Sequence, residues 1–217
     1  MWRNNSLSIV LFALFTVSMA GQALTGWSER NGEARSHGNP EVGLAQYLAS
    51  GHFWEATGEN WESEFLQMAM FVYLTVYLRQ KGSSESKRID TVEAVDLDPL
   101  RFRDDPDVPA PVRAGGWVLK LYEHSLGLAF ALLFLISIGM HLAGGLASHN
   151  RERREHGEPP FTWTEYGASA EFWFESFQNW QSEFLSLGLM VVGTVYLRHR
   201  GSAESKPVYA AHSETGR

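Results

Sequence analysis

Residues 125–150 read SLGLAFALLFLISIGMHLAGGLASHN, a stretch that contains no Asp, Glu, Lys or Arg. A helix needs about 20 mostly apolar residues to cross the hydrocarbon core of a bilayer. This stretch is longer than that, and it predicts a membrane-spanning helix. The alternative is the core helix of a soluble protein, but such helices rarely run so far without a charged side chain.

A second uncharged stretch lies near the N-terminus, from Asn4 to Ser28. It also has features of a secretory signal peptide, because Arg3 precedes the apolar residues and Ser18-Met19-Ala20 is typical of a cleavage site. The sequence of the stretch therefore leaves two interpretations, a spanning helix and a cleaved signal.

An internal repeat decides between them. When the chain is shifted by 119 positions, residues 6–87 fall on residues 125–206 without a gap, and about 34 of the paired positions are identical. We interpret this as the duplication of one two-helix unit. The N-terminal stretch then pairs with the mid-chain stretch, which cannot be a signal peptide, so we expect the first stretch to be retained as a spanning helix.

The second helix of each repeat is less apolar. Residues 65–78 and 184–197 are uncharged, but 14 residues cover only about 21 Å of the roughly 30 Å core. We expect each span to extend back to a tryptophan, which places Glu64 and Glu183 near the hydrocarbon boundary. The predicted interfacial aromatic anchors are Trp54, Trp61, Trp173 and Trp180.

The predicted fold is all-α, an integral membrane four-helix bundle formed by two parallel two-helix repeats. Repeat 1 covers residues 1–88, with spans at about 6–27 and 61–79, and repeat 2 covers residues 117–206, with spans at about 124–147 and 180–198. Interfacial helices are expected before spans 2 and 4. Residues 89–116 are rich in Asp and Pro, which predicts a disordered linker, and residues 207–217 form a tail.

The distribution of basic residues predicts the orientation. Of the 18 Lys and Arg residues, 13 lie at the termini and in the linker with its flanks, and 5 lie in the two other loops. The positive-inside rule therefore places both termini and the linker in the cytoplasm. Since each repeat then enters from the same side, the two repeats are parallel.

A polar stripe approaches spans 2 and 4. Its positions are spaced by 3, 4 and 3 residues, which puts them on one face of a helix. The stripe consists of Thr57, Asn60, Glu64 and Gln67 in repeat 1 and of Ser176, Asn179, Glu183 and Ser186 in repeat 2. Gln22 and His141, which the repeat pairs, are expected to join it from spans 1 and 3.

The stripe has two interpretations. Two facing carboxylates, Glu64 and Glu183, would make a proton or cation site, since ionisable groups at membrane depth usually face the bundle interior. Alternatively, they reach the lipid headgroups or form hydrogen bonds that fix helix packing.

Several classes of site are excluded or unsupported. The chain has no cysteine, which excludes disulfides, thiolate metal sites and cysteine nucleophiles. Its acidic balance and lack of a clustered basic face argue against nucleic acid as a partner. We find no phosphate-binding loop, metalloprotease motif or nucleophile elbow, and we expect no catalytic residue and no cofactor.

The outer loops contain a matched pair of histidines, His37 and His156. They would suit a symmetric external metal site, but no further ligands with metal spacing accompany them. We therefore predict a capping and turn role for both, and no metal.

The duplicated helix pair, the dipeptides Phe53-Trp54 and Phe172-Trp173, and the run Asn-Trp-x-Ser-Glu-Phe at residues 60–65 and 179–184 together resemble a family of functionally uncharacterised bacterial inner-membrane proteins, a domain of unknown function. The resemblance covers nearly the whole chain apart from the linker and tail. It implies a bacterial plasma membrane, and it supplies no activity and no catalytic residues.

From these observations we expect a multi-pass membrane protein of structural or accessory type, without catalytic activity. Its expected partners are the lipid bilayer and either a second copy of the chain or another membrane protein. The alternative is a small proton or cation channel or carrier that uses Glu64 and Glu183. A redox or other membrane enzyme has the least support.

Overall fold

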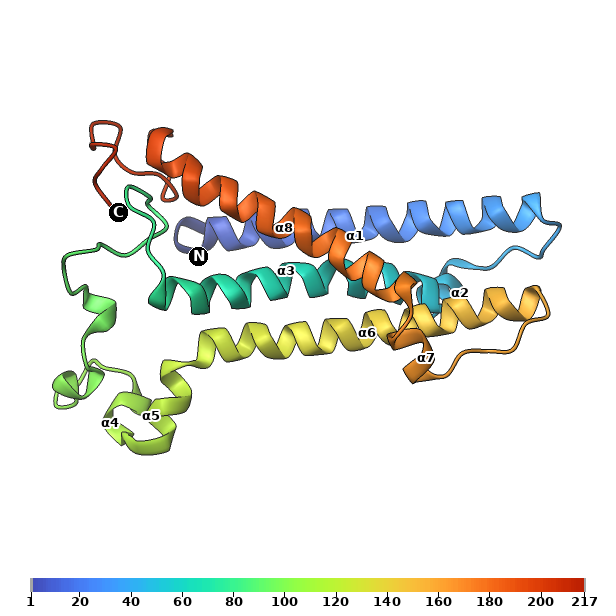
Figure 1. Cartoon of the computed structure of the whole chain (residues 1–217), viewed down its shortest axis with the longest axis horizontal. Coiled ribbons are helices and arrows are strands. Elements are labelled where there is room, and N and C mark those ends of the chain that lie inside the picture. The colour runs from blue at the N-terminus through green and yellow to red at the C-terminus, as the bar shows by residue number, and fades with distance from the viewer. Residues whose placement is uncertain (1, 217) are drawn as a thin grey trace. The chain divides into compact units, whose positions relative to one another are not determined.

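The computed structural model describes residues 2–216, the side chain of Arg3 aside, and this part of the chain holds helices, turns and loops but no strand (Figure 1). The predicted all-α class is confirmed. The elements are α1 (Trp2–Ser36), α2 (Leu44–Leu48), α3 (Gly51–Tyr77), η1 (Ala94–Asp96), η2 (Pro99–Phe102), α4 (Ala110–Ala114), α5 (Gly116–Glu123), α6 (Ser125–Glu155), α7 (Trp163–Gly167) and α8 (Ala170–Tyr196).

Four helices are long. Helices α3 and α8 have 27 residues each, and at 1.5 Å per residue this makes about 40 Å, more than the thickness of a bilayer core. Helix α1 from Asn4 to Ser36 and helix α6 are each long and apolar enough to cross a membrane. Those two helices are the candidate spans among the described residues.

The bounds of the elements follow the 119-residue shift. Helix α7 begins and ends 119 residues after α2, and helix α8 begins and ends 119 residues after α3. The predicted spans 61–79 and 180–198 lie within α3 and α8, apart from their last two residues. Both helices begin well upstream of those spans, at Gly51 and Ala170, and the short helices α2 and α7 precede them.

Contacts divide the chain into two units. Unit 1 comprises residues 1–59 and 138–173, and unit 2 comprises residues 60–137 and 174–217. In unit 1, a small core of Leu146, Tyr166 and Phe172 is packed beside partly buried residues of α6. Unit 2 holds the linker and the segments that follow α3 and α8.

Glycines allow close helix contact in unit 1. A Cβ atom at Gly144 of α6 would lie 2.4 Å from the backbone nitrogen of Glu55 in α3, and a Cβ atom at Gly51 would lie 2.6 Å from the carbonyl oxygen of Gly144. The backbones of α3 and α6 therefore touch. Such contacts through small residues are typical of helices that associate in lipid.

Two tyrosine side chains also make close contacts, each with one glycine. The hydroxyl of Tyr47 lies where a Cβ atom of Gly26 would be, and the hydroxyl of Tyr166 lies where a Cβ atom of Gly145 would be. Both tyrosines are buried. The glycines thus make room for an aromatic ring from the short helix that follows each outer loop.

Each outer loop of unit 1 starts with the same turn. Gly38 and Gly157 have φ angles of 69° and 73°, in the left-handed region that glycine adopts without strain. The amides that follow α1 and α6 donate back to carbonyls of the last helical turn, which is the Schellman pattern of helix ends. The structure therefore has the tight turn that these glycines predict.

An asparagine then closes each loop. The side chain of Asn31 donates to the carbonyl of Val42 (3.0 Å) and accepts from its amide (2.9 Å). Asn150 makes the same two bonds with Phe161, at 2.9 and 2.6 Å. We refer to each pair of bonds as an asparagine clamp.

In unit 2, arginines terminate the long helices. The guanidinium of Arg79 donates to the carbonyls of Thr75, Val76 and Leu78 at the end of α3. Arg198 donates to the corresponding carbonyls at the end of α8. A cation at this end of a helix satisfies free carbonyls and matches the negative end of the helix dipole.

Two lysines bind the segments that follow. Lys206 is fully buried, and its ammonium group donates to the backbone carbonyls of Ala211, His212 and Glu214, which fold around it. Its repeat partner, Lys87, instead pairs with the carboxylate of Asp96 in the linker. One lysine thus holds the tail and the other holds the linker.

The linker contains the one-turn helices η1, η2 and α4. At the start of η2, the side chain of Asp98 accepts a hydrogen bond from the amide of Leu100, and Pro99 occupies the first helical position. The disorder expected for residues 89–116 stays a prediction.

Candidate functional site

The predicted polar stripe is partly assembled in unit 1. The side-chain amide of Gln22 donates to the hydroxyl of Thr57 (3.1 Å), and this buried hydroxyl donates to the carbonyl of Phe53 (2.7 Å). His141 is fully buried, with its ring 4.7 Å from the ring of Phe172. Gln22 and His141 therefore both lie inside unit 1, as part of helix packing.

In unit 2, Gln67 connects two helices. Its side-chain nitrogen, on α3, donates to the backbone carbonyl of Glu183 (2.7 Å) and to the hydroxyl of Ser186 (3.3 Å), both on α8. Gln67 is buried. Three predicted stripe positions therefore meet, although Glu183 contributes its backbone to this contact.

The two predicted carboxylates differ in environment. Glu64 is exposed and Glu183 is half-buried. Asn60 is exposed, whereas the side chain of Asn179 donates to the carbonyl of Glu175 on its own helix (3.2 Å). Ser176 is the buried residue among the four stripe positions of repeat 2.

A different carboxylate is buried between the helices of unit 2. Glu62 is fully buried and accepts a hydrogen bond from the indole nitrogen of Trp180 (3.2 Å). The sequence indicates it only weakly, because it lies off the stripe and its repeat partner is Gln181, which is exposed in the structure. The difference between the two repeats at this position was the only available indication.

The predicted aromatic anchors fall into two kinds. Trp54 and Trp173, in unit 1, are exposed, and Trp173 donates its indole N–H to the carbonyl of Gly167. Trp61 and Trp180, in unit 2, are half-buried. Trp61 packs against Phe65 of its own helix, α3, whereas Trp180 of α8 packs against Phe134 of α6 and so takes part in interhelical packing.

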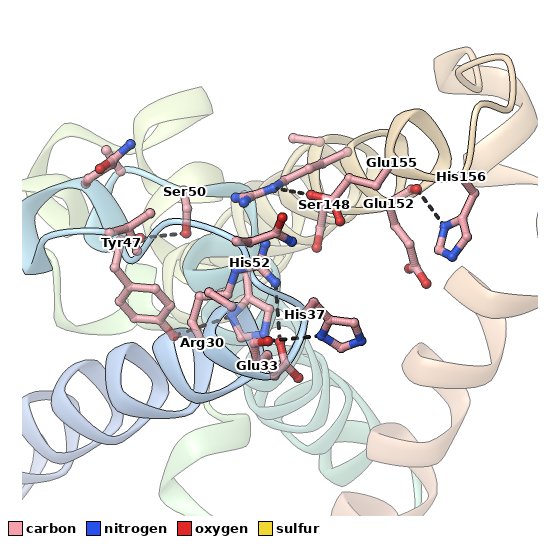
Figure 2. Close-up of a pocket in the computed structure, with 18 residues that line it drawn as sticks. Arg30, Glu33, His37, Tyr47, Ser50, His52, Ser148, Glu152, Glu155 and His156 are labelled. Carbon is pink, nitrogen blue, oxygen red and sulfur yellow. Dashed lines mark hydrogen bonds and ion pairs between the residues drawn. The ribbon is translucent and has the colours of Figure 1, made fainter.

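Unit 1 contains an open cavity of about 960 Å³. Figure 2 shows its wall, to which α1, the turn before α3 and the end of α6 contribute. The ionisable residues that line it are Arg30, Glu33, Tyr47, His52, Arg151, Glu152, Glu155, His37 and His156. The ends of α1 and α6, with the loops that follow them, thus contribute a glutamate and a histidine from matched positions.

Most charges in this cavity are already paired. Arg30 lies 3.3 Å from the carboxylate of Glu33, and Arg151 lies 3.1 Å from that of Glu155. A cavity with neutralised pairs of both signs can accommodate a polar or zwitterionic solute. It offers no field of a single sign that would select a strongly charged one.

The matched histidines take part in the helix ends. The Nδ1 atom of His37 lies 3.0 Å from the carbonyl of Glu33, and that of His156 lies 2.9 Å from the carbonyl of Glu152 (Figure 2). Because a carbonyl only accepts, each Nδ1 carries the proton. These contacts have the geometry of a cap. In the part of the chain that the structure describes, no group of three or more His, Cys, Asp or Glu residues is arranged to hold a metal ion.

A family model described as "Domain of unknown function (DUF6766)" matches residues 1–217, so the chain belongs to this family. The predicted membership of an uncharacterised family is thereby confirmed. Neither the curated proteins nor the solved structures contain a match to this chain.

Proposed function

We propose that this member of the family is a bacterial inner-membrane protein of structural or accessory type, in which α1, α3, α6 and α8 all span the bilayer. The termini and the linker lie in the cytoplasm, and the protein has no catalytic activity of its own. One observation carries the proposal: the long helices expose large apolar side chains, while polar side chains of the same helices are buried.

The outer surface of α1 is the clearest part of this observation. None of the residues in its most apolar part is buried, and Phe12 and Val17 are about 70 % exposed. In the most apolar part of α6, 17 % of the residues are buried. The core helix of a soluble protein would be mostly buried, because exposed apolar surface costs roughly 25 cal/mol per Å² in water. Lipid removes that cost.

The less apolar helices, α3 and α8, have the same distribution in unit 2. Leu185, Leu189 and Val192 of α8 are exposed, whereas Gln67 is buried in contact with α8. Polar groups need partners most where water is absent, and interhelical hydrogen bonds are a common means of association in lipid. This distribution supports the inclusion of α3 and α8 among the spans.

The hydrogen bonding of the stripe supports a structural role. Gln22 and Gln67 each have a partner on another helix, so their polar groups are used in packing. A site that binds and releases an ion needs ligands that are free to exchange. The stripe therefore favours an accessory protein over a transporter.

Cysteine labelling tests the topology without interference, since the chain has no cysteine of its own. Four exposed positions serve, with a cysteine placed singly at Asn39, Asp107, Glu158 or Tyr209. In intact cells with a permeabilised outer membrane, an impermeant maleimide should label the Asn39 and Glu158 variants. The Asp107 and Tyr209 variants should react only after lysis.

A two-span protein gives a different pattern. If only α1 and α6 crossed the membrane, the linker would stay outside and the second outer loop would lie inside. Labelling of the Asp107 variant in intact cells, together with protection of the Glu158 variant, would therefore refute the four-span proposal. Labelling of all four variants would mean that no segment after α1 crosses the membrane, and it would also refute the four-span proposal.

A proton or cation carrier is the second candidate, supported by the presence of two carboxylates, Glu64 on α3 and Glu183 on α8, in the proposed spans of unit 2. Proteoliposomes would report flux for wild type, for the double variant Glu64→Gln, Glu183→Gln, and for Glu158→Gln as a matched control. Flux in wild type and in the control, but not in the double variant, would establish transport. Flux no higher than in empty liposomes, in all three, would leave the accessory proposal.

A further inference from the structure

Helix α5 carries an apolar face that the described structure leaves uncovered. Trp117 and Leu121 are one helical turn apart and are 76 % and 54 % exposed, and Tyr122 beside them is exposed as well. Leu119, on the other side of the helix, is buried. The helix is therefore amphipathic, with one face in the protein and an aromatic and apolar face outward.

The position of α5 in the chain limits where this face can be. The helix ends at Glu123, and after a single residue, His124, helix α6 begins at Ser125. The hydroxyl of Ser125 donates back to the carbonyl of Tyr122 (2.8 Å), which joins the two helices. At its other end, Gly115 and Gly116 have positive φ angles and turn the chain away from α4.

We propose that α5 lies on the cytoplasmic surface of the membrane, with Trp117, Leu121 and Tyr122 inserted among the lipid headgroups. This inference rests on the proposed function, since it requires α6 to be a span. The helix is then held within a few ångströms of the bilayer by its connection to α6. Tryptophan and tyrosine favour this layer, because their rings are apolar and their N–H or O–H groups remain hydrated.

The charges around α5 indicate how it binds. Lys120 and Glu123 offset each other on the helix, and in the linker beside it Arg101, Arg103 and Arg113 are balanced by Asp98, Asp104, Asp105 and Asp107. There is thus no basic face of the kind that selects anionic lipids. The insertion of apolar side chains supplies the attraction, so zwitterionic lipid suffices as the partner.

Spin-label depth measurements test this proposal on the full chain in nanodiscs of phosphatidylcholine. A nitroxide is attached to a single cysteine, and its accessibility to oxygen and to a water-soluble nickel complex is compared. The variants are Leu121→Cys on the proposed face, Glu123→Cys on the same helix, Leu132→Cys in α6 and Asp107→Cys in the linker. Glu123 lies about 200° around the helix from Leu121, so it controls for insertion driven by the label.

We expect the Leu121 label to be intermediate between the labels at Leu132, in hydrocarbon, and at Asp107, in water. The Glu123 label should resemble the Asp107 label, and anionic lipid at one third of the total should change the Leu121 value by less than a factor of two.

A water-like value at Leu121, with a hydrocarbon value at Leu132, would overturn the inference and leave the proposed function intact. A water-like value at Leu132 would overturn both. A Leu121 label shielded from oxygen and nickel alike would mean that protein, and not lipid, covers α5.

Discussion

The contact between α3 and α6 in unit 1 predicts a strong effect from a very small substitution. Gly144→Ala adds one methyl group, at a position where the Cβ atom would lie 2.4 Å from the backbone nitrogen of Glu55 and 2.8 Å from the carbonyl oxygen of Gly51. Both neighbours are backbone atoms, so no side chain can rotate away. The two helices must separate or tilt locally to accept the methyl group.

The size of the shift follows from these distances. Carbon and nitrogen atoms in contact are roughly 3.4 Å apart or more, so the helices must part by about 1 Å. Overpacking of this kind costs about 1–3 kcal/mol. Alanine also favours a helix over glycine by about 0.5–1 kcal/mol, which opposes the effect. The control variant must gain the helix propensity of alanine without the overpacking.

Gly139→Ala is that control. Gly139 lies on the same helix, α6, and nothing is within 4 Å of a Cβ atom placed there. The difference between the two variants is then the packing cost of about 1–3 kcal/mol. For a chain of this length it should lower the melting temperature of Gly144→Ala by roughly 2–12 °C relative to Gly139→Ala.

The eight tryptophans of the chain allow the melting to be followed by intrinsic fluorescence of the purified protein in detergent. Equal melting temperatures for the two variants would refute the argument, because they would mean that the α3 and α6 backbones are not in contact. A lower melting temperature for Gly139→Ala would refute it as well.

Three further predictions concern the loops and the tail. Asn150→Ala removes both bonds of one asparagine clamp and leaves the amide and carbonyl of Phe161 unsatisfied, at a cost of about 1–3 kcal/mol. Hydrogen exchange at the amide of Phe161, followed by mass spectrometry, should become faster, and unchanged exchange would contradict this prediction. Lys206→Met should release the tail and speed exchange across residues 207–216, whereas Lys87→Met should leave that segment protected and loosen the linker instead. Hydrogen bonds from the backbone and side chain of Thr162, the residue before α7, lower the pKa of Glu165. The cap is therefore complete above about pH 4.5 and is lost as the pH falls through the folded-state pKa. The NMR amide shifts of α7 should follow this titration, and a titration at or above pH 4.5 would disprove the prediction.

The long helices could be predicted because their cause is local. A run without charges, such as residues 125–150, predicts a helix that needs no partner to be recognised, and the 119-residue pairing extends the prediction to the matching elements. The turns at Gly38 and Gly157 are likewise local. The long helices and these turns are both determined by residues that are close in the sequence, so the sequence alone predicts them.

The contacts between helices could not be predicted in this way. Gly144 pairs with Thr25 and Gly51 with Ala170 in the repeat, so the pairing does not mark the glycines that touch. Glu62 is buried although Glu64, two residues on, is exposed, because the face that turns inward depends on the neighbouring helix. The partners of Lys206 are backbone carbonyls, which every residue has and no sequence pattern reveals.

The asparagine clamp has a consequence for the two outer loops. Two bonds between one side chain and one backbone residue reproduce a single rung of an antiparallel β-ladder, formed here between a helix and a loop. Each rung joins residues 11 positions apart and so acts as a ruler: a residue inserted or deleted between Asn31 and Val42 forces the loop to strain or to give up both bonds. The outer loops are thus free to vary in sequence while their span is fixed, and the cavity between the helix ends keeps its width.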